Sequence, residues 1–127
     1  MEIFKEFSFD AAHRLVRLPD GHKCARVHGH TYRLRVHVSG EVGDDSGWIL
    51  DFADVSKTTR GVIDQLDHQM LNEIPGLSQP TVERIAEWIW DRLEPDLPGL
   101  CRLTVWEGVS AGCTYTGKGA DPSRGGV

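Results

Sequence analysis

The stretch "HGHTYRLRVHVS", residues 28–39, carries the pattern that decides the fold. Apolar and polar side chains alternate along it, and this period of two is typical of a β-strand with one buried face. The apolar face is formed by Tyr32, Leu34, Val36 and Val38. Because residues i and i+2 of a strand point to the same side, His28 and His30 fall on that face as well.

The segment before this strand, "EIFKEFSFDAAHRL" at residues 2–15, shows the same alternation. One face of this second expected strand carries Ile3, Phe7, Phe9, Ala11 and His13. Proline, aspartate and glycine within residues 16–27 indicate a loop between the two strands. Antiparallel pairing of the strands would therefore place His13 opposite the two histidines that begin the next strand.

Helices and further strands are expected downstream. In chain order they are a turn at 40–47, an extended piece at 48–52, a helix at 54–66, a loop at 72–80, a helix at 81–93, and strands at 101–107 and 112–117. Asp54 and Thr81 are the expected N-caps, and Pro95 is expected to stop the second helix. We expect one domain at residues 1–117 and a disordered tail at 118–127, which lacks apolar content.

The order of these elements predicts the fold class. Strands and helices are grouped rather than alternating, which favours an α+β domain with a four-stranded antiparallel sheet and two helices on one face. Two short helices cannot cover such a sheet on both sides. We therefore expect the other face to be buried by copies of the same chain.

Composition excludes several classes of protein. The chain has 127 residues and a formal net charge of −5, which argues against nucleic acid or an anionic membrane as partner. No apolar run approaches the roughly 20 residues that a membrane span needs, and the N-terminus lacks the form of a signal peptide. The odd count of cysteines, Cys24, Cys101 and Cys113, suits reduced thiols in a cytoplasmic protein.

Three histidines form the first candidate site. His13, His28 and His30 end apolar strand faces, and three imidazoles with an open fourth position are what a catalytic zinc site needs. The competing interpretation is a set of hydrogen-bonded core histidines. Cys24 precedes His28 by four residues and could be a fourth ligand of a structural zinc, a reactive thiolate beside the metal, or inert. Spacing alone leaves these three alternatives open.

Two further positions carry candidate chemistry. Asp67 directly precedes His68 at the expected end of a helix, where a carboxylate could orient and polarise an imidazole. A histidine that only interacts with the helix dipole is the alternative. Glu107 ends an apolar strand face, which is costly for a carboxylate unless a ligand binds it. Adjacent N–H donors of a guanidine-like heterocycle would suit this carboxylate, and a solvated strand end is the alternative.

Several segments together resemble the 6-pyruvoyltetrahydropterin synthase and 6-carboxytetrahydropterin synthase family. They are "FSFDAAHRL" (7–15), "CARVHGH" (24–30), "LDFADV" (50–55), "LDHQMLN" (66–72), "PTVERIAEWIW" (80–90) and "WEGVSAGCTY" (106–115). They occur in the family's order and cover nearly the whole chain except the tail. The resemblance implies the tunnelling fold, in which trimers join their sheets into a barrel and two trimers stack into a homohexamer with interfacial active sites.

The resemblance also implies a role for each candidate residue. The matching positions are the zinc ligands His13, His28 and His30, the catalytic cysteine Cys24, the acid/base pair Asp67 and His68, and the pterin-anchoring Glu107. In this family the cysteine moves a proton on the substrate side chain, so Cys24 would be a base rather than a ligand. The zinc ion would polarise the side-chain oxygens and lower the barrier to proton abstraction.

The spacing C-x-x-x-H-G-H in residues 24–30 is similar to the carboxytetrahydropterin branch, which serves 7-deazaguanine synthesis. The implied reaction converts 7,8-dihydroneopterin triphosphate to 6-carboxy-5,6,7,8-tetrahydropterin, triphosphate and acetaldehyde. Gly108 departs from the threonine that often follows the anchoring glutamate, which leaves substrate preference open. The alternatives are 6-pyruvoyltetrahydropterin synthase, a metal-dependent hydrolase, and a non-enzymatic zinc-stabilised oligomer.

Overall fold

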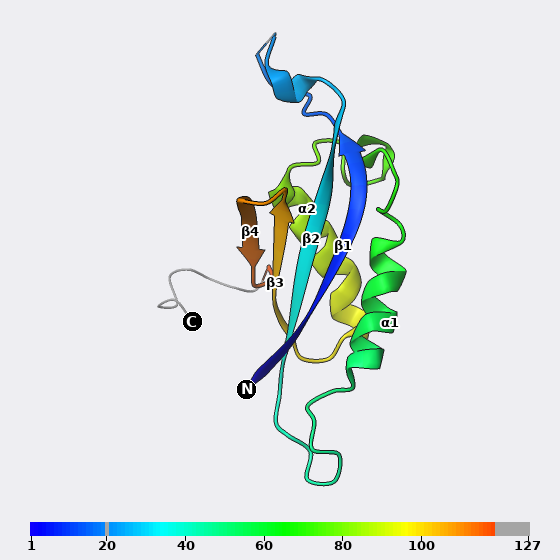
Figure 1. Ribbon diagram of the computed structural model, residues 1–127, viewed down its shortest axis with the longest axis vertical. Helices are drawn as coiled ribbons and strands as arrows, with labels where there is room; N and C mark the ends of the chain where they lie inside the picture. Colours follow the sequence, from blue (N-terminus) through cyan, green and yellow to red (C-terminus); the bar gives the residue numbers. More distant parts are fainter. Residues whose placement is uncertain (20, 119–127) are drawn as a thin grey trace.

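The computed structural model describes residues 1–19 and 21–118 of the chain. Its elements are β1 (Glu2–His13), the 3-10 helix η1 (Lys23–Ala25), β2 (His28–Ser39), α1 (Phe52–Ile63), η2 (Leu71–Glu73), α2 (Val82–Leu93), η3 (Glu94–Asp96), β3 (Leu100–Glu107) and β4 (Ala111–Tyr115). The strands form one sheet in the order β1-β2-β3-β4, and both helices lie on one face of it (Figure 1). The predicted α+β architecture is therefore confirmed. The predicted tail lies outside the described residues except for Lys118.

All neighbouring strands of the sheet pair antiparallel. In the first pair His13 lies directly opposite His28, and Ala11 lies opposite His30. In the second pair Tyr32 lies opposite Glu107. The register therefore brings the three candidate histidines and the candidate carboxylate to the same end of the sheet.

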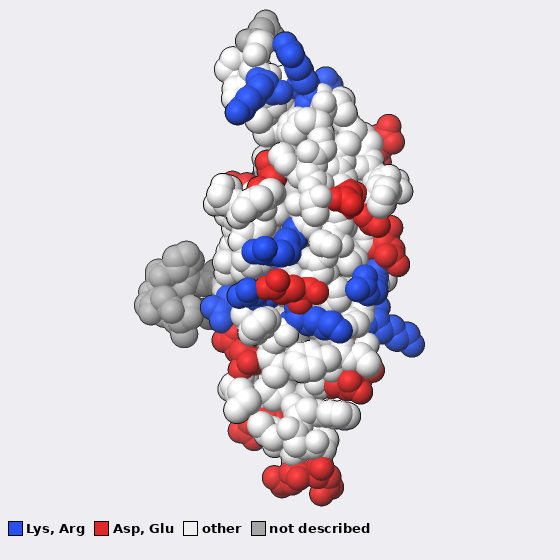
Figure 2. Space-filling view, in the orientation of Figure 1, with Lys and Arg blue, Asp and Glu red and all other residues white. Residues whose placement is uncertain are grey.

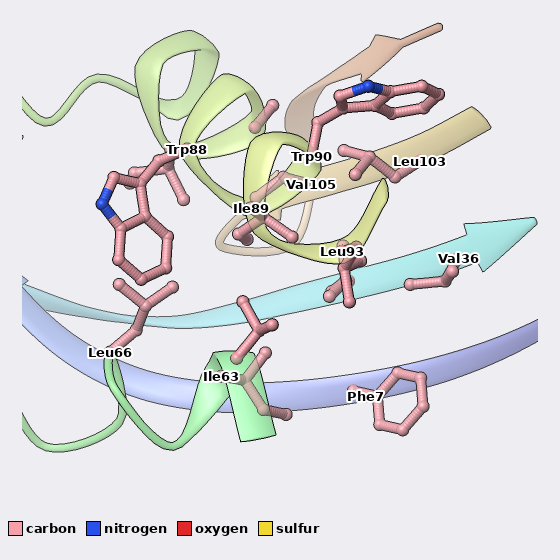
Figure 3. Packing of buried hydrophobic residues seen from close by; sticks show 14 of the residues in the cluster. Phe7, Val36, Ile63, Leu66, Trp88, Ile89, Trp90, Leu93, Leu103 and Val105 are labelled. Carbon is pink, nitrogen blue, oxygen red and sulfur yellow. The ribbon is translucent and has the colours of Figure 1, made fainter. Parts of the chain in front are cut away.

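The hydrophobic core lies between the helices and the sheet face that they cover (Figure 3). The sheet contributes residues whose positions alternate along each strand, including Phe7, Val36, Leu103 and Val105. The helices and the turn after α1 contribute Ile63, Leu66, Trp88, Ile89, Trp90 and Leu93. Because strand alternation sends every second side chain into this core, the histidines of the same parity also point to the helix-covered face.

The start of α1 differs from the prediction. Residues 48–50 are bends rather than an extended piece, and the helix begins at Phe52. Its N-cap is Asp51, whose carboxylate accepts a hydrogen bond from the backbone N–H of Ala53, so Asp54 lies in the first turn instead. The helix also ends at Ile63, three residues before the predicted end. The second helix begins as predicted, because the Thr81 hydroxyl accepts from the N–H of Arg84.

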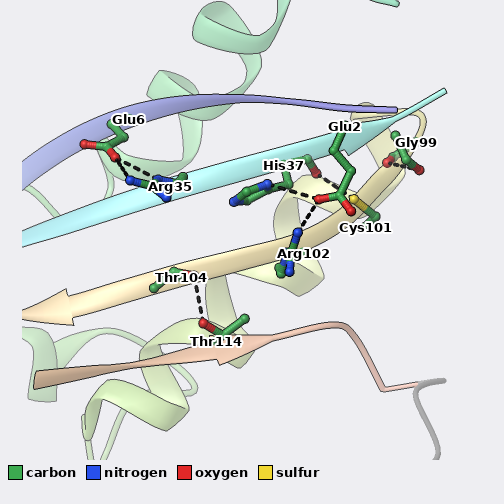
Figure 4. A network of polar contacts seen from close by, with 10 residues as sticks. Glu2, Glu6, Arg35, His37, Gly99, Cys101, Arg102, Thr104 and Thr114 are labelled. Atoms are coloured by element: carbon green, nitrogen blue, oxygen red, sulfur yellow. Dashed lines mark hydrogen bonds and ion pairs between the residues drawn. The ribbon is translucent and has the colours of Figure 1, made fainter. Parts of the chain in front are cut away.

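The other face of the sheet, here called the open face, carries polar and aromatic side chains. Figure 2 shows acidic and basic groups in a band across its middle. Arg35 forms an ion pair with Glu6, and the guanidinium of Arg33 stacks 4.1 Å from the ring centroid of Trp106. Figure 4 shows the network around Glu2 at the far end of this face. The burial of the open face by copies of the chain stays a prediction. No helix among the described residues is long and apolar enough to cross a membrane.

Candidate functional site

Three imidazoles converge at the end of β1 and the start of β2, on the helix-covered face. The ligand nitrogens of His13, His28 and His30 all lie within 4.8 Å of one another. The Nε2 atoms of His13 and His28 are only 3.1 Å apart. His13 is 1% exposed, whereas the other two rings are half-buried. The group, here called the histidine triad, is therefore shielded from solvent at His13 and more open at His28 and His30.

The outer nitrogens of two triad rings fix where their protons lie. His13 Nδ1 lies 2.8 Å from the carbonyl oxygen of Pro80, and His28 Nδ1 lies 2.7 Å from the carbonyl oxygen of Arg26. A carbonyl can only accept a hydrogen bond, so each Nδ1 carries a proton when its ring is neutral. The two Nε2 lone pairs then face each other across 3.1 Å. That arrangement is unfavourable without a cation between the rings and is typical of metal-binding histidines held by carbonyl groups.

The third ring gives an independent indication. His30 Nε2 is buried and has no hydrogen-bond partner among the described residues. It lies 3.3 Å from Glu107 Oε1, but not in hydrogen-bond geometry. Burial lowers the pKa of His13, which favours the neutral ring that a metal ion requires. The residues present therefore fit a metal ion, and an all-imidazole donor set suits zinc among other transition metals.

Cys24 lies in η1, within a loop that projects beyond the end of the sheet (Figure 1). Its backbone N–H donates to His22 Nδ1 at 3.1 Å, and its carbonyl accepts from the N–H of Leu15 at 2.8 Å. The thiol is free and half-buried. Within residues 1–19 and 21–118, the cluster of mutually close ligand atoms at the triad contains the three histidines and not Cys24.

The candidate acid/base pair lies in the turn after α1, beside the edge of β1. His68 Nδ1 lies 3.0 Å from Asp67 Oδ1, so the adjacent side chains do contact each other. The backbone of Asp10 holds both residues: its N–H donates to Asp67 Oδ1 at 3.0 Å, and its carbonyl accepts from the N–H of His68 at 2.6 Å. His68 has a φ of +60°, a left-handed conformation that is uncommon outside glycine and that the neighbouring strand must stabilise.

The triad and the Asp67–His68 pair lie on opposite faces of the sheet. The triad residues share the parity of the buried strand positions. The His68 ring instead lies within 4.8 Å of the Asp10 carboxylate, which has the opposite parity, and lines a hollow of about 560 Å³ with Asp10 and Thr31. Among the described residues, the ligand atoms of the pair and of the triad therefore form two separate clusters, although the triad member His30 also lines the hollow beside His68.

The sequence pattern does not single out Asp10, and it does not show that position 108 has a backbone reason to be glycine. Asp10 is one of several polar residues on the open face of β1, and nothing in the strand pattern distinguishes it. Gly108 lies in the turn between β3 and β4 with a φ of +76°, a conformation that favours glycine over threonine. Its position therefore has a backbone reason as well as any effect on ligand binding.

The Asp67 carboxylate gives a pH-dependent prediction. The N–H of Asp10 is the main cause that lowers the pKa of Asp67, and His68 adds to it. A carboxylate whose pKa is lowered by folding stabilises the protein above its unfolded pKa of about 4 and loses this contribution as pH falls through the folded pKa. We expect Asp67→Asn to lower the urea midpoint near neutral pH, and the deficit to shrink below about pH 4.

The matched control is Asp64→Asn, which removes a carboxylate from the same turn. The Asp64 side chain makes no hydrogen bond or ion pair among the residues that the structure describes, and it lies at the C-terminal end of α1, where a negative charge is unfavourable, so its replacement should not lower the urea midpoint. A deficit of Asp67→Asn that stays constant on acidification would contradict the assigned contacts.

The sequence of the chain is similar to the sequences of several known proteins. The family model described as 6-pyruvoyl tetrahydropterin synthase matches residues 2–118. A dihydroneopterin monophosphate aldolase of Pyrococcus furiosus is 43% identical over 108 residues, covering 83% of this chain and 88% of that protein. A 6-carboxy-5,6,7,8-tetrahydropterin synthase of Synechocystis is 40% identical over 119 residues, covering 89% and 91%.

A solved structure agrees with these sequence relatives. The structure of Caenorhabditis elegans 6-pyruvoyl tetrahydropterin synthase superposes with a TM-score of 0.86 at 29% identity, and the match covers 93% of this chain and 96% of that one. The three related proteins thus carry three different activity names on one fold. Family and fold are common to them, whereas the outcome of the reaction is what distinguishes their names.

Proposed function

Because the chain belongs to the 6-pyruvoyl tetrahydropterin synthase family and is an enzyme of the lyase type, we propose that it is a zinc-dependent 6-carboxy-5,6,7,8-tetrahydropterin synthase. Its substrates would be 7,8-dihydroneopterin triphosphate and water, and its products 6-carboxytetrahydropterin, triphosphate and acetaldehyde. The observation that carries the proposal is the histidine triad with its converging ligand nitrogens, one of which, His30 Nε2, lies 3.3 Å from the Glu107 carboxylate. A metal site beside a carboxylate suits a ligand with both side-chain oxygens and ring N–H donors.

Each candidate residue has a distinct role in this proposal. A metal ion held by the triad would polarise the oxygens of the substrate side chain. Glu107 would accept hydrogen bonds from the amino and ring N–H groups of the pterin, which fixes the ring beside the triad. Cys24, as a thiolate, would remove a proton from a side-chain carbon, and His68, oriented by Asp67, would exchange a proton with the substrate from the other side.

The opposite placement of the triad and the acid/base pair supports an interfacial site. If His68 acts on a substrate held beside the triad, the two must come from different copies of the chain. The polar open face would then face a neighbouring subunit, together with residues 67–70, which hydrogen bonds attach to β1. We propose the homohexamer of the tunnelling fold, in which three sheets close into a barrel and two barrels stack.

A second candidate function follows from the Pyrococcus furiosus relative. Its name describes an aldolase that acts on the monophosphate, and its identity to this chain is 43%. An aldolase would cleave a carbon–carbon bond of the side chain and leave the phosphate on the released fragment. The 6-pyruvoyl activity, which retains the three-carbon side chain, is the third possibility within the same site.

Product analysis by mass spectrometry separates these functions. The zinc-loaded protein is incubated with 7,8-dihydroneopterin triphosphate and, separately, with the monophosphate. We expect 6-carboxytetrahydropterin and acetaldehyde from the triphosphate. A phosphorylated two-carbon fragment from the monophosphate would instead establish the aldolase, and a pyruvoyl product the third activity. No product from either substrate would overturn all three.

The wider setting is proposed on the same basis. The product would enter 7-deazapurine synthesis, whether for queuosine or for a deazapurine secondary metabolite. The three free cysteines suit a reducing compartment, so we propose a cytoplasmic enzyme.

A further inference from the structure

The hollow beside His68 has a floor of two very small residues. Ala12 of β1 and Gly29 of β2 lie directly opposite each other in the register, and both belong to the open face. Asp10 and Thr31 form the next pair along the same face, and His68 with Met70 borders the hollow at the edge of β1. Larger side chains at the two floor positions would fill the space between these walls.

Gly29 is not required by the backbone of its own chain. Its φ is not positive, and a Cβ added there would meet only the carbonyl oxygen of Ala11 at 3.6 Å, an ordinary van der Waals contact. Gly112 shows the opposite case, because its Cβ would lie 2.2 Å from the carbonyl oxygen of Val105. The strand therefore tolerates alanine at position 29, and the space that glycine leaves is available to a ligand.

The polar walls define what kind of ligand fits. Thr31 Oγ1 donates to Asp10 Oδ1 at 2.5 Å, which leaves the other carboxylate oxygen of Asp10 available as an acceptor. The contact of His68 Nδ1 with Asp67 leaves Nε2 of this ring, whose side chain is 77% exposed, available as well. The neighbouring carboxylates of Asp10 and Asp67 repel a phosphate group but accept hydrogen bonds strongly from hydroxyl groups. The hollow therefore suits a hydroxylated carbon chain rather than a phosphate.

We propose that this hollow, in the copy of the chain that supplies His68, is a subsite for the hydroxylated side chain of a pterin substrate held beside the triad of a neighbouring copy. Asp10 accepts a hydrogen bond from a side-chain hydroxyl, Thr31 orients the Asp10 carboxylate, and Gly29 keeps the floor open. The inference rests on the proposed function, because it takes the substrate to be a pterin that His68 reaches. It adds three specificity-determining residues to those that hold the metal, the ring and the catalytic protons.

The test compares two fluorescent ligands on the zinc-loaded full chain. Neopterin carries the trihydroxypropyl side chain, whereas pterin lacks it, and both are titrated at equilibrium. We expect Gly29→Ala to weaken neopterin binding by about tenfold or more, as overpacking of a filled site does, and to leave pterin binding unchanged. The matched control is Gly61→Ala on the exposed face of α1, where a Cβ meets nothing within 4 Å. Metal content and thermal midpoint are measured for every variant.

A second variant keeps the test decisive if Gly29→Ala does not fold. Asp10→Asn retains the shape of the wall but loses the charged acceptor, so neopterin binding should fall by about tenfold and pterin binding should not change. Glu6→Gln removes a carboxylate from the same face of β1, farther from the hollow, and should change neither affinity.

The outcomes distinguish the subsite from the proposed function. Equal losses for neopterin and pterin, or neopterin affinities within about twofold of wild type in a folded Gly29→Ala or Asp10→Asn variant, overturn the subsite and leave the function standing. A wild-type protein that binds neither compound overturns the proposed function, and the subsite with it.

Discussion

Replacement of Cys24 by alanine is expected to leave the metal bound and to reduce turnover by about 10²–10⁴-fold, the usual contribution of a positioned general base. The structure supports separate roles for the thiol and the triad, because Cys24 lies outside the group of converging ligand nitrogens among the described residues. A metal held by three imidazoles loses no ligand when Cys24 changes. The thiol instead belongs to a loop that projects beyond the end of the sheet (Figure 1).

The measurement pairs metal content with steady-state turnover of 7,8-dihydroneopterin triphosphate. Cys101→Ala is the matched control, since that thiol lies in β3 with its Sγ 3.5 Å from the carbonyl oxygen of His37, and it should alter neither quantity. Loss of metal together with thermal stability in Cys24→Ala would show that the cysteine is a fourth ligand. The zinc would then be structural, and the proposed role of Cys24 as a base would be wrong.

Much of the fold could be predicted because its strands are amphipathic. The alternation in residues 28–39 fixes which side chains face the core, and the observed strand has the same bounds as the quoted stretch. The same parity predicted that His13, His28 and His30 share a face, and the register confirms that His13 lies opposite His28. Local chemistry of this kind needs no knowledge of distant contacts.

The remainder depended on contacts that no local pattern contains. Asp51 and Asp54 are both acceptable N-cap residues in the sequence. The helix begins after Asp51 because the backbone is extended at that residue, which the sequence alone does not show. The turn that carries His68 is held by backbone groups of Asp10, which lies 57 residues before Asp67 and has no distinguishing neighbours. The separation of triad and acid/base pair onto two faces of the sheet likewise follows from this long-range attachment.

The facing Nε2 atoms of the triad also bear on stability. Two lone pairs 3.1 Å apart, in rings whose other nitrogens are held by carbonyl groups, make the metal-free state less favourable than the metal-bound state. Metal should therefore stabilise the folded chain by mass action, by about 2.7 kcal/mol at one hundred times the dissociation constant. A triad of ordinary core histidines would show no such dependence on metal.

Replacement of His28 by alanine is expected to remove this dependence and to weaken metal binding by more than about 100-fold, since even loss of a group that only orients a ligand costs 10–100-fold. His28 is half-buried and follows a loop, so the folded state should persist without it. Metal content, thermal midpoint with and without added zinc, and turnover are compared with wild type.

The matched control for this change is His37→Ala, which removes an imidazole of the same strand. His37 lies on the open face with its Nδ1 3.1 Å from Glu2, far along β2 from the triad, so its loss should leave zinc binding intact. Full metal content and a zinc-dependent midpoint in His28→Ala would show that the triad does not hold the ion. If His28→Ala loses the metal and the zinc-dependent midpoint while His37→Ala keeps them, metal binding, stability and turnover all depend on the converging nitrogens.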